Sequence, residues 1–303
     1  MERYKTAVAS CSMLTRLDQT RRDFETSVPT INNFWPKDNT RQTSKLLITS
    51  LPPNNMASTD TVSLHGWTAV PVDAEAIFQG KPYLHEPKRV FVQGIPFPSD
   101  DPLVSRVQAY AKEKLPVPTY NHSMRVYYWA TIILQQQFPS HAATLSPSTL
   151  ALTCLLHDIG TTHDHLHATQ MSFEFYGGIL ALNLLQDPSS EATAPQSQAE
   201  AVCEAIIRHQ DLGTVGEITF LGQLIQLATI YDNVGKFAAL VHADTRVDVN
   251  RAFPRKHWSA CFARTIEEEN GLKPWAHTTH LGRKEFPGGV LENSLMAEYD
   301  DWE

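Results

Sequence analysis

The sequence has few of the features that mark secreted, membrane-spanning or nucleic-acid-binding proteins. Its four cysteines among 303 residues include no pair at CxxC spacing, which predicts free thiols and a reducing compartment. No apolar run approaches the roughly 18 residues that a membrane-spanning helix needs, and no secretory signal is visible. We therefore expect a cytoplasmic protein with no membrane partner.

Positive charge is also scarce. Lys and Arg total 25 against 33 Asp and Glu, which gives a net charge of −8. A nucleic-acid-binding protein needs a basic patch, so nucleic acid is not an expected partner. Hydrophobic residues make up 42% of the chain, enough for a substantial core. This composition fits a soluble protein with a small or neutral substrate.

Residues 1–62 differ from the rest of the chain. They are rich in Ser, Thr, Asn and Pro and have no sustained apolar period, which predicts a disordered or loosely attached N-terminal extension. Arginines between Arg16 and Arg22 leave a mitochondrial presequence open, although nearby acidic residues argue against it. Met56 is a possible alternative start. Residues 63–303 are expected to form one domain.

From Asp101 onward, apolar residues recur at helical spacing. The predicted helices are 101–114, 121–137, 148–158, 172–186, 197–210, 220–241 and 256–269. Short extended pieces are expected at 67–73 and 89–93, and a Gly/Pro/His-rich tail on the surface after Gly271. The predicted fold class is therefore all-α.

His157 and Asp158 stand side by side at the end of an apolar run. Neighbouring residues of a helix project about 100° apart, so both side chains can reach one point only at a helix edge or end. A metal ion is a common reason for such an arrangement, and imidazole with carboxylate suits zinc, manganese or ferrous iron. The dipeptide alone is weak evidence, because it is common.

Three further polar side chains fall on apolar helix faces: His122, His209 and Asp232. An inward histidine is usually a hydrogen-bonded core residue. A buried ionised carboxylate costs several kcal/mol unless it is paired or coordinated, so Asp232 needs a metal, an arginine or a lysine. Taken singly, each residue leaves these alternatives open.

Without His209, the order along the chain is His122, His157-Asp158, Asp232. This H…HD…D order resembles the HD-domain superfamily, a helical bundle that holds a divalent metal. The resemblance implies an HD-domain helical bundle in which these four residues are the metal ligands. Histidines 163, 165 and 167 alternate just past a predicted helix end. This pattern is typical of a polar loop rather than of further metal ligands, so we expect one metal.

Longer motifs narrow the resemblance. They are Asn121-His-Ser, Leu156-His-Asp-Ile-Gly-Thr-Thr, Met171-Ser-Phe-Glu-Phe-Tyr-Gly-Gly, Ala205-Ile-Ile-Arg-His-Gln-Asp, Tyr231-Asp-Asn-Val-Gly and Lys273-Pro-Trp-Ala-His-Thr. Together they resemble the cyanamide hydratase family from about Thr68 to about Met296. The resemblance implies a lyase that adds water to the nitrile of cyanamide to give urea. It also implies one zinc ion per chain, with iron or manganese less favoured, and a homo-oligomer.

The chemistry of a nitrile agrees with this resemblance. Zinc lowers the pKa of a bound water towards about 7, and the zinc-bound hydroxide would attack the nitrile carbon. The nitrile nitrogen then needs a proton, for which His209 is the predicted donor. Thr229 is predicted to orient the substrate or the water. The alternatives are that His209 orients a ligand and that the Thr229 hydroxyl bonds to its own helix.

Other functions remain open from the sequence. An HD-type phosphohydrolase acting on a nucleotide or small phosphate ester would need cationic clamps, and the nearby basic residues are Arg125, Arg208 and Lys236. We expect Arg208 and Lys236 to lie off the inward helix faces. A domain that binds a metal structurally or holds a partner is a third possibility, and another nitrile-like substrate a fourth.

Overall fold

Proline and capping side chains set where many helices begin. Pro102 and Pro147 occupy the first turns of two helices, and the side chains of Asp101 and Ser146 accept hydrogen bonds from backbone N–H groups of those turns. A missing N–H is harmless at the first position of a helix, and a capping oxygen satisfies a free donor there. The sequence thus specifies these starts locally.

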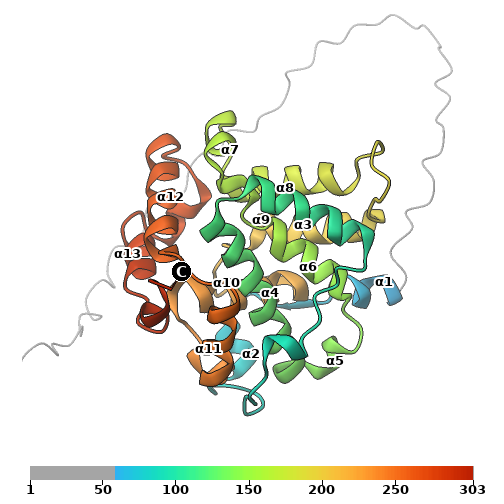
Figure 1. Ribbon diagram of the computed structural model, residues 1–303, viewed down its shortest axis with the longest axis vertical. Helices are drawn as coiled ribbons and strands as arrows, with labels where there is room; N and C mark the ends of the chain where they lie inside the picture. The colour runs from blue at the N-terminus through green and yellow to red at the C-terminus, as the bar shows by residue number, and fades with distance from the viewer. Residues whose placement is uncertain (1–58, 303) are drawn as a thin grey trace, which may run out of the picture. The chain divides into compact units, whose positions relative to one another are not determined.

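The structure, a computed structural model, describes residues 59–302 and is almost entirely helical (Figure 1). The α-helices are α1 Thr59–Leu64, α2 Ala74–Phe78, α3 Pro102–Lys114, α4 Val117–Gln137, α5 Pro139–Ala142, α6 Pro147–Leu156, α7 His163–Ala168, α8 Phe173–Leu185, α9 Gln196–Arg208, α10 Phe220–Val234, α11 Ala243–Ala252, α12 Trp258–Leu272 and α13 Glu285–Leu291. Short 3₁₀ helices are η1 Val92–Gly94, η2 Ile159–Thr161, η3 Ala238–Leu240, η4 His277–Leu281 and η5 Ala297–Tyr299. The strands β1 Ala69–Pro71 and β2 Glu217–Thr219 form one antiparallel pair. The predicted all-α class is confirmed.

Helices α4 and α10 form the centre of the bundle. They pack against each other, and both are buried on nearly every side, as expected for helices that are apolar all round. Figure 1 shows α3, α6, α8 and α9 on one side of this pair and α12 and α13 on the other. Polar residues of α4 and α10 therefore face protein from several directions.

Several predicted elements differ from the structure, among them the polar loop predicted at 163–167, which forms α7. The helix predicted over 220–241 ends at Val234, because Gly235 adopts the left-handed conformation (φ 70°) that caps a helix C-terminus. The tail predicted to lie on the surface forms η4, α13 and η5 instead, and its Met296 and Tyr299 are buried. Helix α11 was not expected at all.

The predicted N-terminal extension lies outside the described residues except for 59–62, which begin α1. The three cysteines within residues 59–302 are free thiols. None of the helices described there is long and apolar enough to cross a membrane. The cytoplasmic location stays a prediction.

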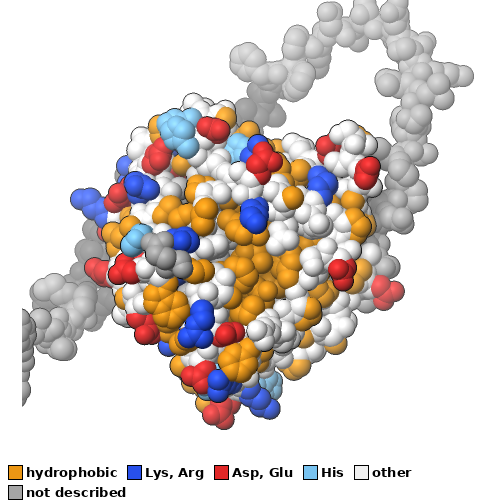
Figure 2. Space-filling view, in the orientation of Figure 1, with side chains coloured by type: hydrophobic (Ala, Val, Ile, Leu, Met, Phe, Trp, Pro, Cys, Tyr) orange, Lys and Arg blue, Asp and Glu red, His pale blue; other side chains and the backbone are white. Residues whose placement is uncertain are grey.

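Apolar side chains also reach the surface. Figure 2 shows them gathered across the middle of one face, over the region where Figure 1 draws α3 and α4. The most exposed large ones include Val117 at the start of α4, Trp275 and Leu291. Such side chains are available for subunit contacts.

The segment that follows α12 holds the start of α8 in place. Three donors reach the residues just before α8: Lys273 Nζ to Met171 O (2.7 Å), Trp275 Nε1 to Gln170 O (2.9 Å) and the His277 N–H to Ser172 Oγ (2.9 Å). In addition, the Phe173 N–H donates to Glu269 Oε1 of α12 (2.7 Å). The Lys273–Thr278 motif thus has a structural role that fixes the position of Phe173.

Two buried carboxyl groups meet at this junction. Thr278 Oγ1 lies 3.0 Å from Glu174 Oε1 and 3.2 Å from Glu269 Oε2. A hydroxyl has one proton, so one of the two contacts requires a carboxyl group that carries its own proton. Burial, and then the charge of Glu174, raise the pKa of Glu269 to about 7. Glu269 is therefore the partner that carries the proton below about pH 7.

This pair makes stability depend on pH. Between about pH 4.5 and 7 the folded protein holds a proton on Glu269 that the unfolded chain releases, so the free energy of unfolding falls as pH rises. Glu269→Gln keeps an uncharged group, and we expect it to stabilise the protein at pH 8 by on the order of 1–3 kcal/mol, with little gain at pH 5. Urea unfolding at both pH values measures this. Glu267→Gln, on the exposed side of α12, is the control; an identical pH dependence for wild type and Glu269→Gln would contradict the assignment.

The turn after the His157-Asp158 pair packs directly on α8. A side chain at Gly160 would overlap the backbone carbonyl of Phe173, and neither backbone can yield easily. We expect Gly160→Ala to lower the free energy of unfolding by about 1–3 kcal/mol. Gly271→Ala in α12, where the space is open, is the control and should be neutral or slightly stabilising. Equal stability of both variants in urea unfolding would refute the packing argument.

Candidate metal centre

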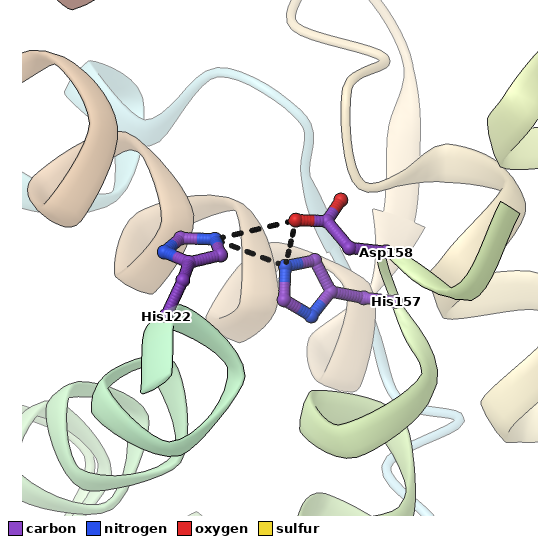
Figure 3. Close-up of side chains that lie close together, drawn as sticks. All are labelled: His122, His157 and Asp158. Carbon is purple, nitrogen blue, oxygen red and sulfur yellow. Dashed lines mark hydrogen bonds and ion pairs between the residues drawn. The ribbon is translucent and has the colours of Figure 1, made fainter. Parts of the chain in front are cut away.

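Three predicted ligands come together where α4 meets the end of α6. His122 lies in α4, and α6 ends at Leu156 with His157 as its C-cap. Asp158 follows with non-helical backbone angles (φ −102°, ψ 12°), so its side chain turns back towards His157. Figure 3 shows the three side chains pointing towards one another. All three are buried.

The distances between their ligand atoms fit a metal ion. His122 Nε2 lies 3.2 Å from His157 Nε2, and Asp158 Oδ2 lies 3.3 Å from His157 Nε2 and 3.6 Å from His122 Nε2. Zinc–nitrogen and zinc–oxygen distances of about 2.0–2.1 Å give a tetrahedron with edges of about 3.3 Å. The triangle formed by the three atoms matches one face of such a tetrahedron.

The hydrogen bonds of the two histidines fix their tautomers. His157 Nδ1 lies 2.8 Å from Cys154 O, and His122 Nδ1 lies 2.7 Å from Asp232 Oδ2. Both oxygens can only accept, so each Nδ1 carries a proton, and the Nε2 of a neutral ring presents a lone pair. Two such lone pairs facing each other at 3.2 Å repel unless a proton or a metal ion lies between them.

Asp158 supports the same conclusion. Neither of its buried oxygens has a hydrogen-bond partner among residues 59–302. Burial opposes ionisation, but His157 and His122 outweigh it and hold the pKa of Asp158 well below its usual range. A buried charge without hydrogen bonds is unfavourable unless a cation compensates it. Burial also lowers the pKa of His122 to about 4, so His122 is a neutral donor of its lone pair.

Asp232, the fourth predicted ligand, lies on the far side of the His122 ring. Its Oδ2 accepts from His122 Nδ1 and from Arg125 Nη2 (2.9 Å), and its Oδ1 from Arg125 Nε (3.0 Å) and Trp129 Nε1 (2.8 Å). Arg255 Nη1 lies 3.2 Å from Oδ2. Burial opposes ionisation, but Arg125 and Arg255 hold the pKa of Asp232 well below its usual range. Asp232 is not one of the three side chains whose ligand atoms converge.

His209 lies beside Asp158, next to the converging ligands. It is the C-cap of α9, and its Nδ1 donates to Ile206 O at 2.6 Å, which leaves a lone pair on Nε2. That Nε2 lies 3.9 Å from Asp158 Oδ1. Burial, and then the charge of His157, lower the pKa of His209. The ring is therefore a neutral proton acceptor beside the converging ligands, held against the ring of Phe173 (5.6 Å between centroids).

Thr229 lies on α10 and is buried. Its hydroxyl donates to its own helix, to Ile225 O (3.0 Å) or Gln226 O (3.1 Å), as the alternative interpretation expected. The oxygen keeps lone pairs that can accept a hydrogen bond. Thr229 and His209 both line a cavity of about 330 Å³ between α10 and the η4–α13 segment.

The cavity has mostly apolar walls with polar groups at its inner end. Leu212, Ile230, Val234, Leu281 and Phe286 form the apolar part of its lining. His209, Gln210 and Asn233 contribute polar groups, and Gln210 Oε1 has no hydrogen-bond partner among the described residues. A small polar molecule can be held there.

Of the three basic residues considered for a phosphate clamp, only Lys236 lines this cavity. Its side chain is exposed and follows the end of α10, off the inward face as expected. Arg125 is occupied by Asp232, and Arg208 by Asp211 (Nη2–Oδ2 2.8 Å). The walls therefore carry one cation, Lys236, and one anion, Glu285.

Sequence reasoning missed several residues that shape the site. Trp258 of α12 stacks on His122 (4.2 Å between centroids, 13° between planes), and Arg255 reaches Asp232 from the loop before α12. Phe173 packs on His209. Only the shared motif around Phe173 gave a sequence signal, because the other two contacts depend on how α12 folds back.

Comparisons with known proteins identify the family of this chain. The family model of the HD domain matches residues 119–234, which contain all six predicted site residues. Two relatives from Saccharomyces cerevisiae, cyanamide hydratase DDI2 and cyanamide hydratase DDI3, are each 43% identical over 234 residues, covering 77% of this chain and 99% of the relative. The resemblance inferred from the motifs is confirmed: the chain belongs to the cyanamide hydratase family of the HD-domain superfamily.

Proposed function

We propose that this protein is a hydro-lyase that adds water to the nitrile of cyanamide and releases urea. The names of its two relatives give this activity, and each is aligned over nearly its whole length. The observation that carries the proposal is the convergence of His122, His157 and Asp158 beside the neutral ring of His209. Cyanamide, a small neutral molecule, suits a cavity whose walls are mostly apolar and carry one cation, Lys236, and one anion, Glu285.

A single zinc ion per chain, held by His122, His157 and Asp158, fits these residues best. Two imidazoles and one carboxylate leave a coordination position free for water or substrate, as in catalytic zinc sites. The same donors also accept iron or manganese, which we consider less favoured. Such a metal supplies a Lewis acid that makes water acidic enough to react near neutral pH.

His209 moves the proton that the reaction requires. Water forms a C–O bond to the nitrile carbon while one C–N π pair moves to the nitrile nitrogen. The Nε2 lone pair of His209 accepts a proton from the water and returns it to that nitrogen. Transfer of the second water proton from oxygen to the same nitrogen completes urea, so atoms and charge balance. The sequence predicted His209 as a donor; its tautomer supports a first role as acceptor.

Thr229 and the cavity position the substrate. Because the Thr229 hydroxyl donates to its own helix, it offers only its acceptor lone pairs to the cavity. Either the amino group of cyanamide or the attacking water can donate to it. Thr229 is thus an orienting group in this proposal and takes no part in proton transfer.

Asp232 acts on His122 in this proposal. The sequence predicts a fourth metal ligand, but its carboxylate is engaged by His122 Nδ1, two arginines and Trp129. One nitrogen of such a histidine binds the metal, and the other donates a hydrogen bond to the carboxylate. That hydrogen bond fixes the ring and its tautomer and makes the metal-binding nitrogen a better ligand. These contacts support the orienting role over direct ligation.

Phosphate-ester hydrolysis is the alternative activity. Its transition state spreads negative charge over the phosphoryl oxygens and needs several cationic groups. Lys236 is the one basic side chain of the three considered that lines the cavity. The cavity therefore supports a neutral substrate.

We also propose that the protein forms a homo-oligomer, for which the exposed Val117, Trp275 and Leu291 side chains are suitable.

Replacing a ligand and replacing the proton carrier should have different effects. We expect His157→Ala or Asp158→Ala to lose both the metal and urea formation. His209→Ala should keep the metal and lose on the order of 10²–10⁴-fold in kcat. Metal analysis and a urea assay on the same samples measure both quantities.

Added imidazole serves as the control for His209→Ala. If His209 carries the proton, free imidazole in the emptied cavity should restore part of the rate, whereas a structural defect would not respond. Loss of the metal from His209→Ala would show instead that His209 is a ligand, and the one-metal assignment to three residues would be wrong.

The role of Asp232 is tested by Asp232→Asn, which keeps the shape and removes the charge. We expect the variant to retain a metal site with about 10–100-fold weaker affinity, because His122 is less firmly oriented. Competition with a chelator measures the affinity. If the variant binds no metal while circular dichroism shows it folded, Asp232 is a ligand, as the sequence predicts.

A further inference from the structure

A second group of metal-binding side chains lies on the surface, away from the proposed catalytic centre. His163 and His167 of α7 and Glu268 of α12 bring one ligand atom each to within 4.8 Å of one another. Figure 2 shows histidine side chains beside acidic ones at the upper edge of its face, where Figure 1 draws α7 next to the end of α12. The proposed function uses none of these three residues.

The spacing within the group fits a metal. His163 Nδ1 lies 3.3 Å and His167 Nε2 3.0 Å from the same oxygen, Glu268 Oε1. Both distances are close to the edge of about 3.3 Å expected between ligands of a tetrahedral zinc ion. Residues four apart on a helix lie on one face, so α7 presents the two imidazoles together. The ring centroids are 4.4 Å apart.

The chemistry of the group selects the kind of cation. Two imidazoles and one carboxylate favour zinc, nickel or copper, whereas magnesium and calcium prefer oxygen ligands alone. The side chain of His163 is 75% exposed and that of Glu268 is 38% exposed. Water can therefore complete the coordination, and the ion can exchange with solvent.

We propose that His163, His167 and Glu268 form a second, peripheral site for a divalent transition metal, zinc above all, which joins α7 to α12. Sequence reasoning assigned the three histidines from 163 to 167 to a polar loop. The structure instead forms a short helix there and brings Glu268 to it from about a hundred residues away.

The position of the site gives it a consequence for the fold. His165 Nδ1 of α7 donates to Ile159 O of the turn after Asp158 (2.7 Å), and α12 carries the Trp258 ring that stacks on His122. An ion at the peripheral site links these two elements from outside. Zinc bound there should raise the melting temperature without entering the cavity.

The experiment is zinc binding to untagged full-length protein by equilibrium dialysis at micromolar free zinc, with the metal counted by mass spectrometry. We expect wild type to bind one zinc per chain more than His163→Ala/His167→Ala. His85→Ala, which removes an exposed histidine elsewhere, should bind as much as wild type. Equal binding by wild type and the double variant would overturn the proposal.

Two further measurements keep the test independent of folding and of the catalytic centre. Glu268→Gln changes one atom of the site and should weaken the affinity for the additional zinc by at least tenfold. This variant decides the question if the double variant folds poorly. Unchanged affinity would contradict the site. In the His157→Ala background the peripheral zinc should remain. If His157→Ala lost the additional zinc while His163→Ala/His167→Ala kept it, the ion would belong to the catalytic centre instead.

Discussion

The carboxylate of Asp232 carries a negative charge in a part of the core that water does not reach. Arg125 and Arg255 neutralise it, Trp129 donates to it, and it accepts from His122 Nδ1. Arg255 also binds Asp300 near the C-terminus (Nε–Oδ1 2.9 Å). Because a buried charge with a missing partner is strongly destabilising, these contacts tie α4, α10, the loop before α12 and the C-terminal segment to one point.

The Asp232 carboxylate also determines the chemistry of the site. With its Nδ1 proton held by Asp232, His122 turns a lone pair towards His157 and Asp158, and the stacked ring of Trp258 keeps it in place. Backbone carbonyls fix His157 and His209 in the same tautomer. Three imidazoles thus turn their Nε2 atoms towards an ionised carboxylate, and burial keeps those of His122 and His209 neutral. This arrangement can hold a cation and accept a proton close to it, which are the two requirements for adding water to a nitrile.

The sequence predicted those features that depend on local rules. Apolar residues at helical spacing located most of the longer helices, and inward polar residues on apolar faces identified His122, His209 and Asp232 as buried. What depends on tertiary closure was not predictable. Arg255 has no local signal for its contact with Asp232, and Glu174 and Glu269 meet across 95 positions of the chain. Helix α10 ended early because Gly235 outweighed the apolar pattern that continues to Val241.

Zinc titration of metal-depleted protein, with urea and phosphate measured in the same samples, tests the central claim most directly. Cyanamide and a panel of nucleotides serve as substrates. The account predicts that urea formation rises with added zinc and levels off at one equivalent per chain, with no phosphate released. Urea formation that is independent of zinc, or phosphate release without urea, would contradict it.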